Sequence, residues 1–224
     1  MLRLALPMTL AQLINVLYNI IDRIFIGRIP FDSTNALTGL GVAFPICTIT
    51  IAFANLVGMG GAPRASIALG AKEHDRAERI LGTCTAALWA LALVLTALFL
   101  LFQAPLLKLF GASADTLPYA MQYLSIYVLG TVFVMTALGL NGFITAQGSS
   151  AVAMKTVVIG AVLNVVLDPL FIFVLHMGVR GAAVATVLSQ AVSAAWVLRF
   201  LTGKNTVLRL RRSTLRIDTK LLLP

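Results

Sequence analysis

Two carboxylates stand inside long apolar stretches of the sequence. Asp22 lies within residues 17–27 and Asp168 within residues 162–173. An acid at the centre of a membrane helix costs about 2.5–3.5 kcal/mol to insert, so it is usually retained because its charge or its proton is used. Asn164 precedes Asp168 by four residues, which places both on one helix face. Such oxygens suit a hard cation such as Na⁺, and a desolvated carboxylate pair suits proton exchange. The chemistry therefore permits either Na⁺ or H⁺ as the ion that these residues bind.

Each acid also has a purely structural alternative. Asp168 could be satisfied by Asn164 and nearby backbone groups. Asp22 could form a local pair with Arg23 or Arg28 on its own helix. Adjacent residues on a helix point apart, which weakens the Arg23 alternative.

The composition indicates that membrane-spanning helices position these acids. Hydrophobic residues make up 59% of the 224 residues, charged residues make up 11%, and the mean hydropathy is +0.96. These values lie far outside the range of soluble proteins. The apolar runs are unbroken and long enough to cross about 30 Å of hydrocarbon, which favours helices over a β-barrel. The predicted helices span 4–27, 39–62, 81–102, 119–144, 152–175 and 180–202.

Lysine and arginine set the expected orientation. With the N-terminus inside, thirteen of these residues fall in inner loops and the tail, and four fall outside. The positive-inside rule therefore predicts a multi-pass protein of the inner or plasma membrane with both termini cytoplasmic. Residues 1–203 would form the membrane lobe, and residues 204–224 a basic cytoplasmic linker.

Several other classes of function lack support in the sequence. The formal net charge of +9 resides in loops and the tail, where topology and anionic lipid explain it without nucleic acid. Residues 203–206 imitate the end of a P-loop, but Leu198 replaces its first glycine, so no ATP site is expected. Cys47 and Cys84 lie in apolar sequence, and no metal-ligand spacing accompanies them. We expect no enzyme activity, no cofactor other than a coupling ion, and no structural metal.

The two ends of the chain echo each other. Residues 220–224, Lys-Leu-Leu-Leu-Pro, repeat the pattern of residues 3–7, Arg-Leu-Ala-Leu-Pro. Transporters are commonly built from two related halves. We therefore predict an all-α bundle of six transmembrane helices that forms one lobe of a two-repeat, 12-helix transporter. Its partner would be a C-terminal lobe of the same protein or a second copy of this chain.

Several motifs together resemble the multidrug and toxic compound extrusion (MATE) family of transporters over essentially the whole chain. The combination of Asp-x-x-x-x-Gly in the first helix with Asn-x-x-x-Asp-Pro in the fifth is the most specific part. The stretches that carry the resemblance are Leu4-Ala-Leu-Pro-Met8, Leu17-Tyr-Asn-Ile-Ile-Asp-Arg-Ile-Phe-Ile-Gly27, the Gly-rich residues 58–70, Ala146-Gln-Gly148, Leu163-Asn-Val-Val-Leu-Asp-Pro169 and Gly181-Ala-Ala-Val-Ala-Thr186.

The resemblance implies a cation site in this lobe. Family members use an Asp on the first helix with an Asn, an Asp and a Thr on the fifth and sixth, which match Asp22, Asn164, Asp168 and Thr186. Counting about 1.5 Å per residue from the nearest loops places all four in the outer half of the bilayer. The site would bind a proton or Na⁺.

Three further positions match the family more loosely. Tyr123 matches a residue that hydrogen-bonds the fifth-helix carboxylate, with an interfacial aromatic role as the alternative. Asn141 matches another member of the network, but its depth favours a plain interhelical hydrogen bond. Pro7 matches a first-helix proline associated with a bend, for which its missing N–H is a physical reason.

The implied function is secondary-active multidrug efflux. H⁺ or Na⁺ would exchange for amphipathic or cationic compounds by alternating access of two lobes. A first alternative is a related flippase for a lipid or a lipid-linked oligosaccharide, which would favour an arginine-lined cavity over a carboxylate one. A second is a non-transporting membrane assembly module or a membrane enzyme.

Overall fold

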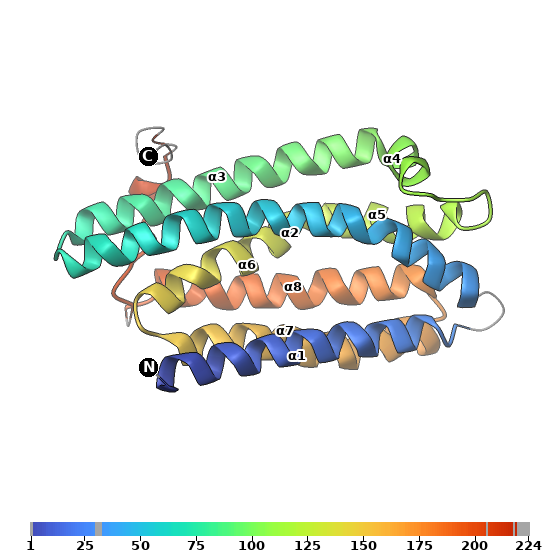
Figure 1. The fold of residues 1–224 in the computed structure, drawn as a ribbon, viewed down its shortest axis with the longest axis horizontal. Helices are drawn as coiled ribbons and strands as arrows, with labels where there is room; N and C mark the ends of the chain where they lie inside the picture. The colour runs from blue at the N-terminus through green and yellow to red at the C-terminus, as the bar shows by residue number, and fades with distance from the viewer. Residues whose placement is uncertain (1, 30–32, 205, 217, 219–224) are drawn as a thin grey trace.

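The computed structural model describes residues 2–29, 33–204, 206–216 and 218, and this part of the chain is helical without strands. The helices run side by side along the long axis of the molecule (Figure 1). The start of α1 and the end of α8 lie at one end, which also carries the turns between α2 and α3 and between α6 and α7 (Figure 1). The elements are α1 (Leu2–Ile26), α2 (Ser33–Gly70), α3 (His74–Leu101), α4 (Gln103–Leu109), α5 (Leu117–Leu129), α6 (Thr131–Ala146), α7 (Ser150–Pro169), the π-helix η1 (Leu170–Val174), α8 (Val179–Thr202) and the 3₁₀ turn η2 (Arg212–Thr214).

Six membrane crossings account for the bundle. Five helical segments in the described residues are long and apolar enough to span a membrane, and α5 with α6 forms a sixth, bent span. Each predicted apolar segment corresponds to one of these spans. The prediction of an all-α six-helix membrane bundle is therefore confirmed.

Two helices are longer than their apolar segments. The α2 helix has 38 residues, which is roughly 57 Å and nearly twice the thickness of a hydrocarbon core. It continues through Pro45 and Pro63, and α3 begins at His74 instead of residue 81. Hydropathy marks the apolar part of a helix, whereas the helix itself continues into polar sequence where its backbone bonds persist. The predicted bounds 39–62 and 81–102 were too short for this reason.

The predicted helix 119–144 is broken at Gly130. Its halves α5 and α6 are bent by 58°. Gly130 packs against α8 so closely that a Cβ there would lie 2.5 Å from Cγ2 of Val187. Thr96 of α3 donates a hydrogen bond to the carbonyl of Val128 at 3.1 Å, which satisfies a backbone group beside the break.

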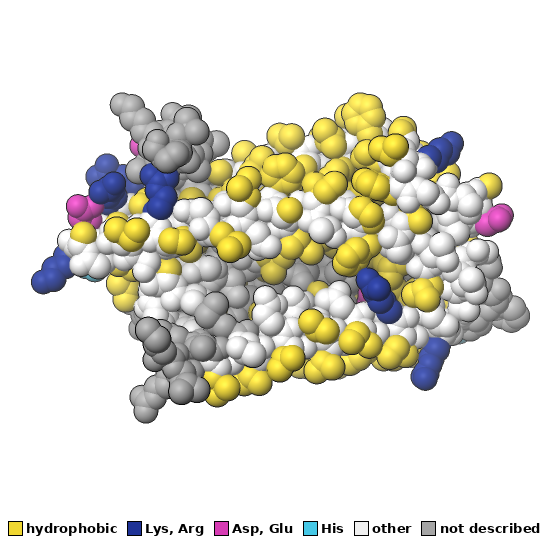
Figure 2. Space-filling view, viewed as in Figure 1, with side chains coloured by type: hydrophobic (Ala, Val, Ile, Leu, Met, Phe, Trp, Pro, Cys, Tyr) yellow, Lys and Arg dark blue, Asp and Glu magenta, His cyan; other side chains and the backbone are white. Residues whose placement is uncertain are grey.

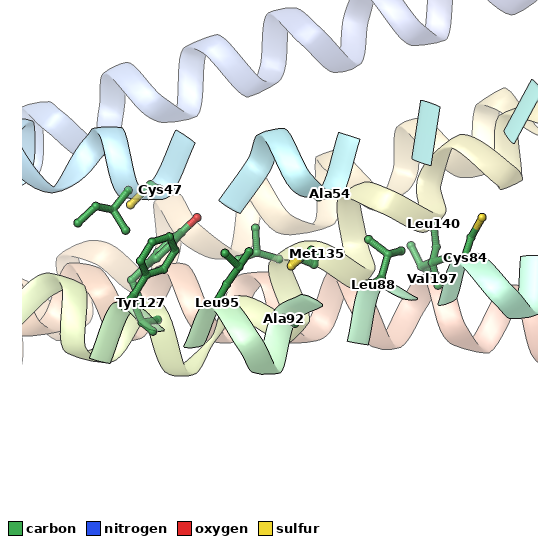
Figure 3. Close-up of a cluster of buried hydrophobic side chains, with 14 of the residues drawn as sticks. Cys47, Ala54, Cys84, Leu88, Ala92, Leu95, Tyr127, Met135, Leu140 and Val197 are labelled. Atoms are coloured by element: carbon green, nitrogen blue, oxygen red, sulfur yellow. The ribbon is translucent and has the colours of Figure 1, made fainter. Parts of the chain in front are cut away.

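Small residues allow the helices to approach each other in the core. A Cβ on Gly58 of α2 would lie 2.7 Å from the carbonyl oxygen of Gly139 on α6, as is typical of membrane helix packing. Leu88, Met135 and Leu140 fill the space between α3 and α6 (Figure 3). Cys47 and Cys84 are buried free thiols of this core.

The segment after α8 is docked on the bundle. We call residues 206–216 the strap. Oε1 of Gln147, in the turn between α6 and α7, accepts hydrogen bonds from the Thr206 hydroxyl and the Val207 amide at 2.8 and 2.9 Å. Arg211 pairs with Glu78 of α3 at 3.1 Å. The strap is therefore a packed part of the lobe, whereas the echo at residues 220–224 lies outside the described residues.

Candidate functional site

Packing of α1 along α7 brings the two membrane acids together. The carboxyl groups of Asp22 and Asp168 lie within hydrogen-bonding reach of one another when one of them carries a proton. Asp168 is fully buried, and Oδ1 of Asp22 is also buried. The pair therefore occupies a site from which water is largely excluded.

Two neutral polar residues complete the cluster. Nδ2 of Asn164 lies 3.3 Å from Oδ1 of Asp168 and donates a hydrogen bond to it. The same nitrogen lies 3.5 Å from Oγ1 of Thr186, a longer and weaker contact across to α8. The structure thus brings all four sequence-predicted residues, Asp22, Asn164, Asp168 and Thr186, to one place between α1, α7 and α8.

Three oxygen atoms in this cluster are buried without a hydrogen-bond donor. They are Oδ1 of Asp22, Oδ1 of Asn164 and Oδ2 of Asp168. Buried polar atoms are nearly always paired, so such a group of acceptors calls for a ligand that supplies positive charge. A hard cation bound by oxygen, or a proton shared between the acids, fits these atoms.

The structural alternatives for the acids do not account for this arrangement. Among the described residues neither Arg23 nor Arg28 forms an ion pair with Asp22, and the guanidinium of Arg23 instead lies 5.2 Å from the ring centre of Phe44. Asn164 satisfies one oxygen of Asp168 and leaves the other without a donor. The described residues hold no cluster of three or more His, Cys, Asp or Glu side chains, so a cation here would rely on the amide and hydroxyl as well.

The three loosely matched positions fall in different places. Tyr123 is buried and stacks on Tyr127, with ring centres 5.9 Å apart. Its hydroxyl lies within hydrogen-bonding reach of Thr186 on α8 and so adjoins the cluster. Asn141 donates a hydrogen bond to the Ala153 carbonyl at 3.2 Å, which is an α6–α7 contact outside the cluster. Pro7 lies within α1, which continues on both sides of it.

A large cavity beside the cluster was not expected from the sequence. It has a volume of about 630 Å³ and lies between α1, α2, α5, α6, α7 and α8. We call it the amide cavity, because its lining includes the side-chain amides of Gln12, Asn15, Asn19, Asn55, Asn141 and Gln190. The spacing of the three α1 amides by three and four residues is a helical face, and this signal could have indicated the cavity.

The geometry defines a class of membrane transport protein: one helical lobe with a buried carboxylate pair beside a cavity. Residues 7–170 match the MatE family. The chain belongs to this family.

Curated relatives of the chain are multidrug exporters. The multidrug export protein MepA of Staphylococcus haemolyticus is 31% identical over 208 residues, which cover 93% of this chain and 46% of the relative. MepA of Staphylococcus aureus is 28% identical over 92% of this chain and 46% of the relative. The chain thus spans about half the length of the curated relatives it matches.

Solved structures share the fold. A crystal structure of MATE in the bent conformation has a TM-score of 0.90 at 27% identity, covering 99% of this chain and 49% of that protein. A multidrug resistance MATE family transporter in an outward-facing conformation matches with the same TM-score of 0.90 and the same coverage. A transporter of the MOP superfamily from Pyrococcus furiosus, described as having reversed polarity in its binding pocket, has a TM-score of 0.90 over 99% of this chain and 48% of that protein. The fold is therefore that of one lobe of such a transporter.

Proposed function

We propose that this chain is the N-terminal lobe of a cation-coupled multidrug exporter. The observation that carries the proposal is the cluster of buried acceptor oxygens on Asp22, Asn164 and Asp168 that lack a donor. The names of the curated relatives support export of drugs as the function. A second lobe, supplied by the same polypeptide or by another copy of this chain, would complete the transport path.

The chemistry of the cluster supports coupling to H⁺ or Na⁺. With both acids ionised and no cation, two negative charges face each other in a site shielded from water, which is costly. A cation or proton cancels this repulsion and draws α1 toward α7 and α8, whose side chains supply the remaining oxygens. Occupancy would then favour one conformation of the lobe, because a ligand shifts a population by its differential affinity for the two states.

Thr186 connects ion binding to substrate binding. Its hydroxyl contacts Asn164 of the cluster, and the same residue lines the amide cavity. A change in the cluster would therefore move a wall of the cavity. In this arrangement the coupling ion need not touch the substrate in order to change its affinity.

The orientation proposed for the lobe follows its arginines and lysines. Figure 2 shows dark blue side chains gathered at the end of the molecule that carries the α2–α3 turn. We propose that this end faces the cytoplasm and that the acid cluster lies nearer the outer face. A coupling ion would then enter from outside.

Replacement of Asp168 by Asn tests the proposal in a polypeptide or assembly that contains both lobes. The change removes one charge of the pair and keeps the shape of the side chain. We expect ion-gradient-driven export of a fluorescent cationic dye from proteoliposomes to fall to the background of empty vesicles. The control is Asp115→Asn, which alters an exposed acid far along the chain.

Export by Asp168→Asn at the unaltered rate would remove this residue from the mechanism. Imposing a proton gradient and a Na⁺ gradient separately on the unaltered protein identifies the coupling ion. Activity that needs neither gradient would contradict cation coupling itself.

A further inference from the structure

The charge of the amide cavity differs from that expected for a cavity that takes cations. Among the residues that line it, Arg23 is the one with a charged side chain, and no Asp or Glu belongs to the lining. Asp22 and Asp168 do not line the cavity themselves. Asn164, which donates a hydrogen bond to Asp168, contacts Thr186, and Thr186 lines the cavity. The one charged side chain of the lining is therefore positive, although Asp22 lies close enough behind it to interact with the charge of Arg23.

Arg23 presents this charge at the boundary between α1 and α2. Its guanidinium lies 5.2 Å from the ring centre of Phe44, which also lines the cavity. The side chain of Arg23 is exposed, and among the described residues it has no carboxylate partner within ion-pair distance. Figure 2 shows the surface hollowed between α1 and α2, with hydrophobic side chains along the edges of the hollow.

Arg23 lies in the last turn of α1, and the natural partner of a guanidinium that has no carboxylate partner is an anion. A guanidinium stacked on an aromatic ring keeps its N–H groups free to form a two-bond contact with a carboxylate. The remaining lining supplies neutral amide donors together with the rings of Phe44, Tyr18 and Tyr127. A volume of about 630 Å³ is sufficient for a compound of drug size.

We propose that the amide cavity binds an amphipathic aromatic compound through its carboxylate, and that Arg23 is the residue that recognises this group. The inference rests on the proposed export function and assigns the substrate class to this lobe. It also modifies the expectation of cationic substrates, because the charged group that the amide cavity recognises is an anion, and a cationic group of the same compound would have to lie away from Arg23. Zwitterionic compounds satisfy both requirements.

A matched pair of dyes tests the proposal by binding alone. Rhodamine B carries a free carboxylate, and its ethyl ester lacks this charge but keeps the ring system. The chain is placed in phosphatidylcholine nanodiscs, and the affinity for each dye is measured by fluorescence anisotropy without any ion gradient. Because no transport is required, failure of ion coupling cannot be mistaken for failure of this recognition.

Loss of a charge-assisted contact should weaken binding by about tenfold or more. We expect Arg23→Gln to weaken rhodamine B binding by this factor and to change binding of the ester less than twofold. Arg23→Lys should recover part of the affinity, since lysine restores the positive charge but cannot form the two parallel hydrogen bonds of a guanidinium. Arg28→Gln is the matched control, because Arg28 is an exposed arginine near the same end of α1 that does not line the cavity.

Four results would overturn the proposal. One is equal weakening of both dyes by Arg23→Gln, which would indicate lost packing in place of carboxylate recognition. The second is unchanged binding of rhodamine B to Arg23→Gln, and the third is no binding of rhodamine B to the unaltered chain. The fourth is loss of selective rhodamine B binding when phosphatidylglycerol replaces part of the phosphatidylcholine, which would assign Arg23 to a lipid phosphate. Unchanged size-exclusion profiles show that the variants remain folded.

Discussion

The carboxyl groups of Asp22 and Asp168 lie close together, and two of their oxygen atoms have no hydrogen-bond donor. Asn164 donates to one oxygen of Asp168, while the other oxygen and Oδ1 of Asp22 lack donors. A purely structural site would be expected to pair these acceptors, because an unsatisfied buried acceptor costs about 1–3 kcal/mol. The lobe therefore holds a locally unfavourable arrangement that a transported cation would relieve.

Replacing Asp168 should accordingly stabilise the lobe when no ion is bound. Asp168→Asn replaces an acceptor that faces Asp22 with an amide donor, so we expect stabilisation by about 1 kcal/mol, or roughly 2–4 °C in Tm for a chain of this size. The measurement is thermal unfolding of the chain in detergent at alkaline pH without Na⁺, so that neither candidate ion occupies the site. The exposed Asp115→Asn variant should leave Tm unchanged, and a lower Tm for Asp168→Asn would contradict the account of unpaired acceptors.

The bent span formed by α5 and α6 depends on contacts from two neighbouring helices. Gly130 allows Val187 of α8 to approach the break, and Thr96 of α3 caps the carbonyl of Val128. Tyr123 and Tyr127 lie on α5 just before this point, stacked on each other. The break therefore helps to place the rings that stand between the core and the acid cluster.

Adding one methyl group at the break should be costly. In Gly130→Ala the new Cβ would lie 2.5 Å from Cγ2 of Val187, and overpacking of this kind costs about 1–3 kcal/mol. We expect a lower Tm for Gly130→Ala and recovery when Val187→Ala is added. Gly41→Ala is the matched control, because no atom lies within 4 Å of a Cβ at Gly41. Equal Tm values for both single variants would show that the contact with Val187 does not constrain the helices.

Across the whole lobe, the strap connects elements that are distant in sequence. It joins the α6–α7 turn through Gln147 and the start of α3 through Glu78. Leu208 of the strap is fully buried. The strap thus packs on the end of the bundle that carries the α2–α3 turn. It would therefore move with the lobe during any conformational change.

Breaking the ion pair of the strap should make it accessible. The Glu78 side chain is 10% exposed, whereas that of Arg211 is 57% exposed, so Glu78→Gln mainly removes the buried anchor. We expect trypsin to cleave the strap roughly tenfold faster, as a loss of about 1.4 kcal/mol in docking would predict. Limited proteolysis followed by mass spectrometry measures this rate. Glu73→Gln breaks an exposed pair with Arg76 and should leave the rate unchanged; acceleration by both variants would argue against a specific anchor.

The sequence predicted the six spans and singled out Asp22 and Asp168, because acids stand out in apolar helices, and the four-residue spacing put Asn164 on the face of Asp168. The grouping of these residues with Thr186 was implied by the resemblance to the MATE family. It did not predict the break at Gly130, since this depends on contact with α8 far along the chain. The amide cavity was missed because half of its amides lie on three other helices, so that the face of α1 amides gave only part of the pattern. The strap was missed because a basic tail gives no local sign that Gln147 and Glu78 will hold it.

The partners of the strap are made at very different times during synthesis. Glu78 and Arg211 are separated by roughly 130 residues, which a ribosome adds in roughly 7–26 s at 5–20 residues per second. Glu78 can therefore pair with Arg211 only after the last helix of the lobe has been synthesised. Docking of the strap would then be a late event in biogenesis, and the α2–α3 hairpin would remain open to quality-control proteases until it occurs.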